Sequence, residues 1–141
     1  MNFSLPVRVY YQDTDAAGVV FHGTYLDFME RARVEWLRVL GFEPQELARR
    51  FGLVFIVRHV DIAYVKPAVL DDLIIVSTAV EKLGRAQVTL VQEITRGSEV
   101  VVRASVNLAC VATGSLKPMP VPDELRNSFA DDVVSPIEAT A

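Results

Sequence analysis

The chain has 141 residues and a mass of 15.6 kDa, enough for one domain with its own hydrophobic core and too little for two. Its composition, 51% hydrophobic and 23% charged, is typical of globular proteins and excludes an extended disordered chain. The net charge of −4 argues against nucleic-acid binding, which needs a basic surface. A single cysteine excludes an internal disulfide and a cysteine-built zinc site, and two histidines far apart in the chain argue against a histidine-rich metal centre. We therefore expect no metal and no cofactor.

The N-terminal residues carry neither the basic nor the apolar run that begins a secretory signal. No stretch of the chain approaches the roughly 18 apolar residues that a membrane-spanning helix needs. We therefore expect a cytoplasmic protein with no membrane span and no nucleic-acid partner.

The first expected element is a strand over 7–11, where β-branched and aromatic residues follow one another. Segment 12–18 is rich in turn-forming residues and ends in a glycine. From residue 24 to residue 40 apolar side chains recur at steps of three and four, which predicts an amphipathic helix. Its apolar stripe consists of Tyr25, Met29, Ala32, Trp36 and Leu40, and its polar face of Asp27, Arg31, Glu35 and Arg38, which are spaced for ion pairs.

Both ends of this helix carry sequence signals. Thr24 and Asp27 have the spacing of a capping box at the start, and Gly41 stands where a glycine ends a helix. A short second helix is expected over 44–51, with Gly52 ending it.

After residue 52 the apolar period changes to two, which predicts strands. The last three strands are separated by two-residue breaks, which are typical of antiparallel hairpins. The tail from residue 114 contains four of the seven prolines, and we expect it to be an irregular strap. One long helix and five strands make an α+β domain, in which the helix covers one face of the sheet. The four strands after the helix are expected over 54–65, 73–83, 86–96 and 99–113.

The last strand has two unequal faces. One face is apolar throughout. The other consists of Val101, Arg103, Ser105, Asn107, Ala109, Val111 and Thr113, and it is apolar at both ends. Because no second long helix is available to cover this face, we expect a partner subunit to cover it, and we predict a homo-oligomer.

Few residues suggest catalysis from their pattern alone. The chain shows no Ser/His/Asp or Cys/His arrangement and no glycine-rich phosphate loop, and Cys110 is interpreted as a small buried hydrophobe. Segment 13–23 places carboxylates and a glycine-containing apolar loop just before the start of the long helix. A helix start has unpaired N–H groups that suit a developing oxyanion. The plainer interpretation is an Asx turn that leads into a capped helix.

Residues 14–25, TDAAGVVFHGTY, resemble the active-site signature of the 4-hydroxybenzoyl-CoA thioesterase family, and more closely that of its YbgC-like acyl-CoA thioesterase subgroup. The resemblance covers about residues 5–125. Further matching segments are 10–15, 30–33, 65–68, 71–72 and 116–122.

The resemblance implies a hotdog fold, a five-stranded antiparallel sheet wrapped around one long helix, with residues 1–141 forming a single domain that dimerises or forms a homotetramer. It implies hydrolysis of an acyl-CoA thioester, and analogy with the subgroup suggests a short-to-medium acyl chain. The acyl group could also be carried by acyl carrier protein in place of coenzyme A. The alternatives are a hotdog dehydratase, whose histidine-containing helix motif is absent, and a non-catalytic binding or scaffold module.

The resemblance also assigns roles to residues of the loop. Asp15 would be the catalytic carboxylate, acting either as a nucleophile that forms a mixed anhydride or as a general base on water. Asp13 would be structural. The backbone N–H at or near His22 would polarise the carbonyl, whereas the His22 side chain could position water, bond to Asp15 or line the pocket. The expected substrate-binding residues of this loop are Gly18, Val20 and Phe21.

Candidates outside the loop each have a plainer alternative. His59 is either a substrate contact or a surface or interface histidine, and Arg33 is interpreted as the salt-bridge partner of Glu30. Basic residues at loop positions could meet the phosphates of coenzyme A, although a solvated side chain is the simpler explanation; these are Lys66, Arg85 and Lys117.

Overall fold

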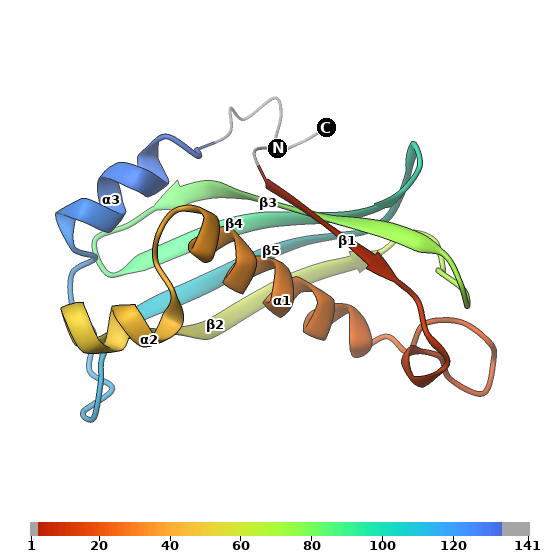
Figure 1. Ribbon diagram of the computed structural model, residues 1–141, viewed down its shortest axis with the longest axis horizontal. Coiled ribbons are helices and arrows are strands. Elements are labelled where there is room, and N and C mark those ends of the chain that lie inside the picture. Colours follow the sequence, from red (N-terminus) through yellow and green to blue (C-terminus); the bar gives the residue numbers. More distant parts are fainter. Residues whose placement is uncertain (1–2, 134–141) are drawn as a thin grey trace.

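The structure, a computed structural model, describes residues 3–133 and consists of one five-stranded antiparallel sheet with a long helix lying across one face (Figure 1). The strand order is β1-β3-β4-β5-β2, so that β1 and β2 form the two edges. The expected hotdog architecture is confirmed. The elements are β1 (Phe3–Arg8), η1 (Tyr11–Asp13), α1 (Thr24–Val39), α2 (Pro44–Glu46), η2 (Leu47–Phe51), β2 (Leu53–Tyr64), β3 (Leu73–Leu83), β4 (Gln87–Arg96), β5 (Glu99–Ala112) and α3 (Asp123–Ala130).

Helix α1 holds the core together because its apolar stripe packs on the sheet. Four of the five predicted stripe residues are buried, together with Phe28 and Leu37; Leu40 lies just beyond the helix and is only partly buried. Fully burying a large apolar side chain contributes about 1.5–3 kcal/mol, so this stripe is a main source of the stability of the domain. On the outer face Arg38 pairs with Glu35 at 3.3 Å.

The sequence predicts the C-terminal end of α1 correctly but not its N-terminal cap. The expected capping box at Thr24 is wrong: the N-cap is Gly23, no side chain caps the helix, and the Thr24 N–H donates instead to the carbonyl of Phe21 at 2.9 Å. The C-terminal expectation is confirmed. Gly41 has φ +95°, and the Phe42 N–H returns to the Leu37 carbonyl at 2.8 Å, which closes the helix as a Schellman motif.

Two expectations about the chain ends are wrong. β1 begins four residues and ends three residues earlier than predicted, because the chain after Arg8 turns into the 3₁₀ helix η1. Pro6 is tolerated because β1 is an edge strand. The tail is not an irregular strap throughout, since α3 forms over 123–130. Leu125 and Phe129 of α3 are buried, and the Phe129 ring stacks on Trp36 at a centroid distance of 5.1 Å.

The sheet face that α1 does not cover is less apolar than the sequence suggested. The apolar ends of β5 are already buried within the chain: Val111 pairs with Pro118 of the tail, and the carbonyl of Val101 accepts hydrogen bonds from the segment after β2. The middle is polar, where Arg103 pairs with Glu93 at 3.1 Å. Burial of these ends therefore does not require a partner subunit, and the homo-oligomer stays a prediction that needs another basis.

Candidate active site

The loop between β1 and α1 is held by one buried acid. Asp13 is 7% exposed; its carboxylate accepts the Tyr10 N–H at 2.8 Å and its backbone carbonyl accepts the Phe21 N–H at 2.9 Å. A bridge between Thr14 and Val20 closes the loop. Asp13 thus has the structural role expected of it, and it fixes where the loop starts and ends.

Asp15 opens a tight turn at the tip of this loop. The Gly18 N–H donates to the Asp15 carbonyl at 3.0 Å, and Gly18 has φ +81°, a conformation that glycine adopts without strain. Asp15 Oδ1 accepts the Ala17 N–H at 2.8 Å, so the Asx turn of the plainer interpretation is present. Within residues 3–133 the other oxygen, Oδ2, has no hydrogen-bond partner, and the Asp15 residue is exposed. The turn therefore orients the carboxylate and leaves one oxygen available for chemistry.

The start of α1 presents two adjacent amides without acceptors. The N–H groups on either side of them are used, by Phe21 toward Asp13 and by Thr24 toward Phe21. The N–H groups of His22 and Gly23 donate to no group among residues 3–133. Unpaired N–H groups at the positive end of a helix are suited to a partial negative charge on a ligand oxygen.

Asp15 and His22 line one open hollow of about 330 Å³, and Gly23 is the next residue of the chain. The walls of the hollow come from the Asp15 loop, the first turn of α1 and the segment in which β2 ends. Sequence reasoning had placed Asp15, Val20, His22 and Lys66 here and had suggested Val19 as an apolar shield. It missed Tyr25, which was interpreted as core, and Tyr64, Val65 and Pro67, whose only signal is their position at the end of a predicted strand. The lining residues are Asp15, Val19, Val20, His22, Tyr25, Tyr64, Val65, Lys66 and Pro67.

The segment after β2 is fixed against the hollow by three sets of contacts. The Tyr25 hydroxyl accepts the Ala68 N–H at 3.1 Å, and burial raises the pKa of Tyr25, so the phenol stays protonated at neutral pH. Arg96 bonds to Asp72 at 2.7 Å and to the Pro67 carbonyl at 3.0 Å. Lys66 is held at the rim by Glu99, at 2.8 Å.

Other predicted binding residues are not brought to the hollow within this chain. Gly18 shapes the turn without lining the hollow, and Phe21 packs its ring on His22 at 4.4 Å. His59 lies on the opposite face of the sheet, in a depression with Thr89 and Asn107.

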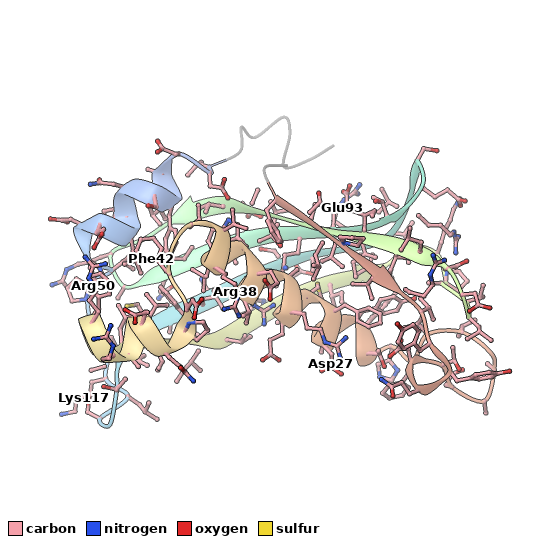
Figure 2. The ribbon with its side chains drawn as sticks, in the orientation of Figure 1. Asp27, Arg38, Phe42, Arg50, Glu93 and Lys117 are labelled. Atoms are coloured by element: carbon pink, nitrogen blue, oxygen red, sulfur yellow. The ribbon has the colours of Figure 1, made fainter. Side chains whose placement is uncertain are left out.

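The remaining two basic candidates lie at the far end of the molecule. Arg85 is in the β3–β4 turn beside α3, and its carbonyl accepts the Val121 N–H (Figure 1). Lys117 lies beyond α2, away from Asp27 in the first turn of α1 (Figure 2). Of the three basic residues, only Lys66 is near Asp15 in one chain.

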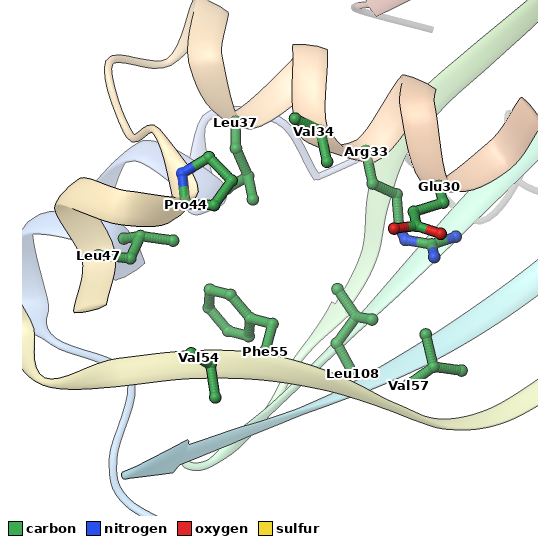
Figure 3. Close-up of a pocket in the computed structure, with 10 residues that line it drawn as sticks. All are labelled: Glu30, Arg33, Val34, Leu37, Pro44, Leu47, Val54, Phe55, Val57 and Leu108. Atoms are coloured by element: carbon green, nitrogen blue, oxygen red, sulfur yellow. The ribbon is translucent and has the colours of Figure 1, made fainter. Parts of the chain in front are cut away.

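A second cavity, of about 400 Å³, runs between α1 and β2 (Figure 3). Its walls are mainly apolar, with Glu30 and Arg33 at one end. The expected Arg33–Glu30 salt bridge is not within 4.0 Å; instead the Arg33 guanidinium donates to the buried Gln92 at 3.0 Å. Burial lowers the pKa of Arg33, and the nearby Glu30 acts in the opposite direction.

Among residues 3–133 no three His, Cys, Asp or Glu side chains are grouped as a metal site. In the same residues, no helix has the length and apolar character needed to cross a membrane.

Comparison with known proteins places this geometry in a family. The family profile described as thioesterase-like superfamily matches residues 9–129. The chain belongs to this superfamily. It is 45% identical to the acyl-CoA thioesterase YbgC of Haemophilus influenzae over 127 residues, which cover 90% of this chain and 93% of that protein. It is 38% identical to the acyl-CoA thioester hydrolase YbgC of Escherichia coli over 128 residues, 90% of this chain and 95% of the relative.

Solved structures agree with the fold. The crystal structure of a probable thioesterase from Bartonella henselae superposes with a TM-score of 0.81 at 38% identity, covering 84% of this chain and 98% of that one. A hypothetical protein from Aquifex aeolicus superposes with a TM-score of 0.83 at 30% identity, covering 90% and 98%. The resemblance of residues 14–25 to a thioesterase signature is thereby confirmed at the level of the family.

Proposed function

We propose that this protein is an acyl-CoA thioesterase that hydrolyses the thioester to a free acid and coenzyme A. The observation that carries the proposal is that one hollow is lined both by Asp15, with an available carboxylate oxygen, and by His22, whose amide at the start of α1 is unpaired within residues 3–133. The named activity of the YbgC relatives, at 38–45% identity over most of the chain, supports it.

In this proposal the thioester carbonyl oxygen lies against the N–H groups at the start of α1. As the carbonyl carbon is attacked, negative charge develops on that oxygen, and the amides stabilise it; one such donor contributes about 3–4 kcal/mol in other acyl transfers. The carbon–sulfur bond then breaks, and coenzyme A leaves as the thiolate and takes up a proton.

Asp15 has two possible roles in the attack. As a nucleophile it forms a mixed anhydride that water hydrolyses, and as a general base it removes a proton from the attacking water. Rapid acid quench followed by mass spectrometry of the Asp15 peptide separates the two, because only the first route acylates the carboxylate.

The contacts of the His22 side chain support a lining role. Its ring packs on Phe21 at 4.4 Å and meets the Tyr64 ring edge-on at 6.3 Å, and within residues 3–133 it forms no hydrogen bond to Asp15. We propose that it shapes the hollow and shields the carbonyl from water.

For the substrate we propose a short-to-medium aliphatic acyl group, because Val19, Val20, Val65 and Pro67 give a small hollow apolar walls. Lys66 at the rim is the proposed contact for the phosphates of coenzyme A or for the prosthetic group of an acyl carrier protein. Gly18, Phe21, His59 and Arg85 stay predictions as binding residues, as does the cytoplasmic location.

The proposed homo-oligomer now rests on β2. This strand has 12 residues and is an edge of the sheet, with no further strand beside it in the part of the chain that is described. Ile56 and Val57 are 40% and 44% exposed along it, and the cavity between α1 and β2 lies on the same side. A long apolar edge strand is a site for pairing with another chain, and we propose a second copy.

The test is thiol release from a panel of acyl-CoA esters of increasing chain length, followed with a colorimetric thiol reagent. The proposal expects turnover that is highest for short or medium chains. Tight binding of the esters without thiol release from any of them would instead support the binding or scaffold module.

A further inference from the structure

A hydrogen bond from the edge strand β2 supports the proposed oxyanion site at the start of α1. Tyr64, the last residue of β2, donates its hydroxyl proton to the backbone carbonyl of His22 at 3.0 Å, across 42 positions of sequence. The Tyr64 ring is held from two sides, by the Tyr25 ring at a centroid distance of 5.8 Å and by the His22 ring at an angle of 87°. The hydroxyl therefore has a defined direction toward the start of α1.

The His22 carbonyl is available to Tyr64 because the Leu26 N–H, which could reach it in a regular helix, donates to another carbonyl. The Leu26 N–H donates to the Gly23 carbonyl at 3.1 Å, one residue further along. Within residues 3–133 the Tyr64 hydroxyl is the one group that donates a hydrogen bond to the His22 carbonyl.

This contact acts on the start of α1 through the plane of the His22–Gly23 peptide. The His22 carbonyl and the Gly23 N–H belong to the same planar peptide group, so holding the oxygen fixes the direction of the N–H. A hydrogen bond accepted at the oxygen also polarises the peptide and strengthens its N–H as a donor.

We propose that Tyr64 is a positioning residue, whose hydroxyl orients the His22–Gly23 peptide and so holds the start of α1, with the His22 N–H, in place against the hollow. The inference rests on the proposed thioesterase function. It adds to that function a residue outside the matched signature 14–25.

Tyr64→Phe removes only the hydroxyl and keeps the ring, so it measures the contribution of that group. The side chain is 48% exposed, so its loss leaves no deeply buried group unpaired, and the melting temperature should change by less than about 2 °C. We expect kcat to fall about tenfold and KM to stay within about twofold, because the interaction stabilises charge that exists only in the transition state. Tyr10→Phe is the matched control: Tyr10 is 60% exposed and does not line the hollow, and both kinetic constants should stay unchanged.

A backbone signal tests the peptide directly. In ¹⁵N-labelled protein the Gly23 amide resonance should shift in Tyr64→Phe and not in Tyr10→Phe. A shifted resonance with a kcat defect supports the role. Wild-type kcat in Tyr64→Phe overturns it, as does a raised KM at unchanged kcat, which would make Tyr64 a substrate contact. Failure of the variant to fold also overturns it, since an exposed positioning hydroxyl is not needed for folding. Absence of turnover by the wild type would refute the proposed function instead, and the Gly23 resonance would still report whether the hydrogen bond forms.

Discussion

Gly18 and Gly114 form a matched pair that separates stability from catalysis. Both have left-handed backbone conformations, at φ +81° and +84°, and in both cases an added Cβ would meet no atom within 4 Å. An alanine at either position is therefore strained by its backbone alone. Gly18 ends the turn that carries Asp15, whereas Gly114 follows β5 at the far end of the sheet.

The expected losses of stability and of rate follow from the backbone conformation of the two glycines. Placing an L-residue such as alanine in the left-handed conformation destabilises the folded protein by about 1–2 kcal/mol. Alanine also restricts the unfolded chain more than glycine does, which offsets about 0.4–1 kcal/mol of this loss. The net loss is about 1 kcal/mol for each variant, or about 3 °C in melting temperature for a chain of this size. If the turn relaxes to relieve the strain, the Asp15 carboxylate moves, and a displacement near 1 Å can lower the rate up to about 100-fold.

We therefore expect Gly18→Ala and Gly114→Ala to melt at similar temperatures by circular dichroism, at one protein concentration. Only Gly18→Ala should lose kcat, by about tenfold or more, in the thiol-release assay. Equal kcat for the two variants would refute the reasoning that this turn positions the catalytic carboxylate.

Two further predictions concern α3 and the rim of the hollow. Phe129→Ala leaves a cavity against Trp36 and should lower the stability by about 3–5 kcal/mol, about 10 °C in melting temperature, whereas Val39→Ala, which is 73% exposed, should change it little. Equal melting curves would show that α3 is not part of the core. Lys66→Glu should raise KM for acyl-CoA esters several-fold at nearly unchanged kcat, while Lys82→Glu, at an exposed position near the end of β3, should not. An equal rise in both variants would contradict the proposed place of the coenzyme A phosphates.

The sequence predicted those parts of the fold that follow from local periodicity. The stripe of α1 and the alternation in β3 and β4 are set by which side chains must face the core, and the predicted bounds of these elements agree with the structure to within one residue. α3 was missed because the prolines before it outweighed the 3.6-residue spacing of Leu125 and Phe129, although the acidic pair Asp123 and Glu124 after Pro122 is a sign of a helix start.

The site was predictable only where it is contiguous in sequence. The Asp15 turn and the start of α1 lie within ten residues, so one pattern contains both. Tyr64 and Pro67 reach the hollow through the register of β2 on β5, which no local pattern encodes. The same register carries His59 to the opposite face, where a bulge between Val57 and His59 shifts the alternation.

The central claim is that the Asp15 carboxylate carries the reaction. Its most direct test is kcat/KM for Asp15→Asn on the best acyl-CoA ester of the panel, beside Asp27→Asn, which alters an exposed acid of α1 outside the hollow. The account predicts a loss of about 100-fold to 10,000-fold for Asp15→Asn with unchanged melting behaviour, and wild-type values for Asp27→Asn. A folded Asp15→Asn protein that turns over within threefold of the wild type would contradict it.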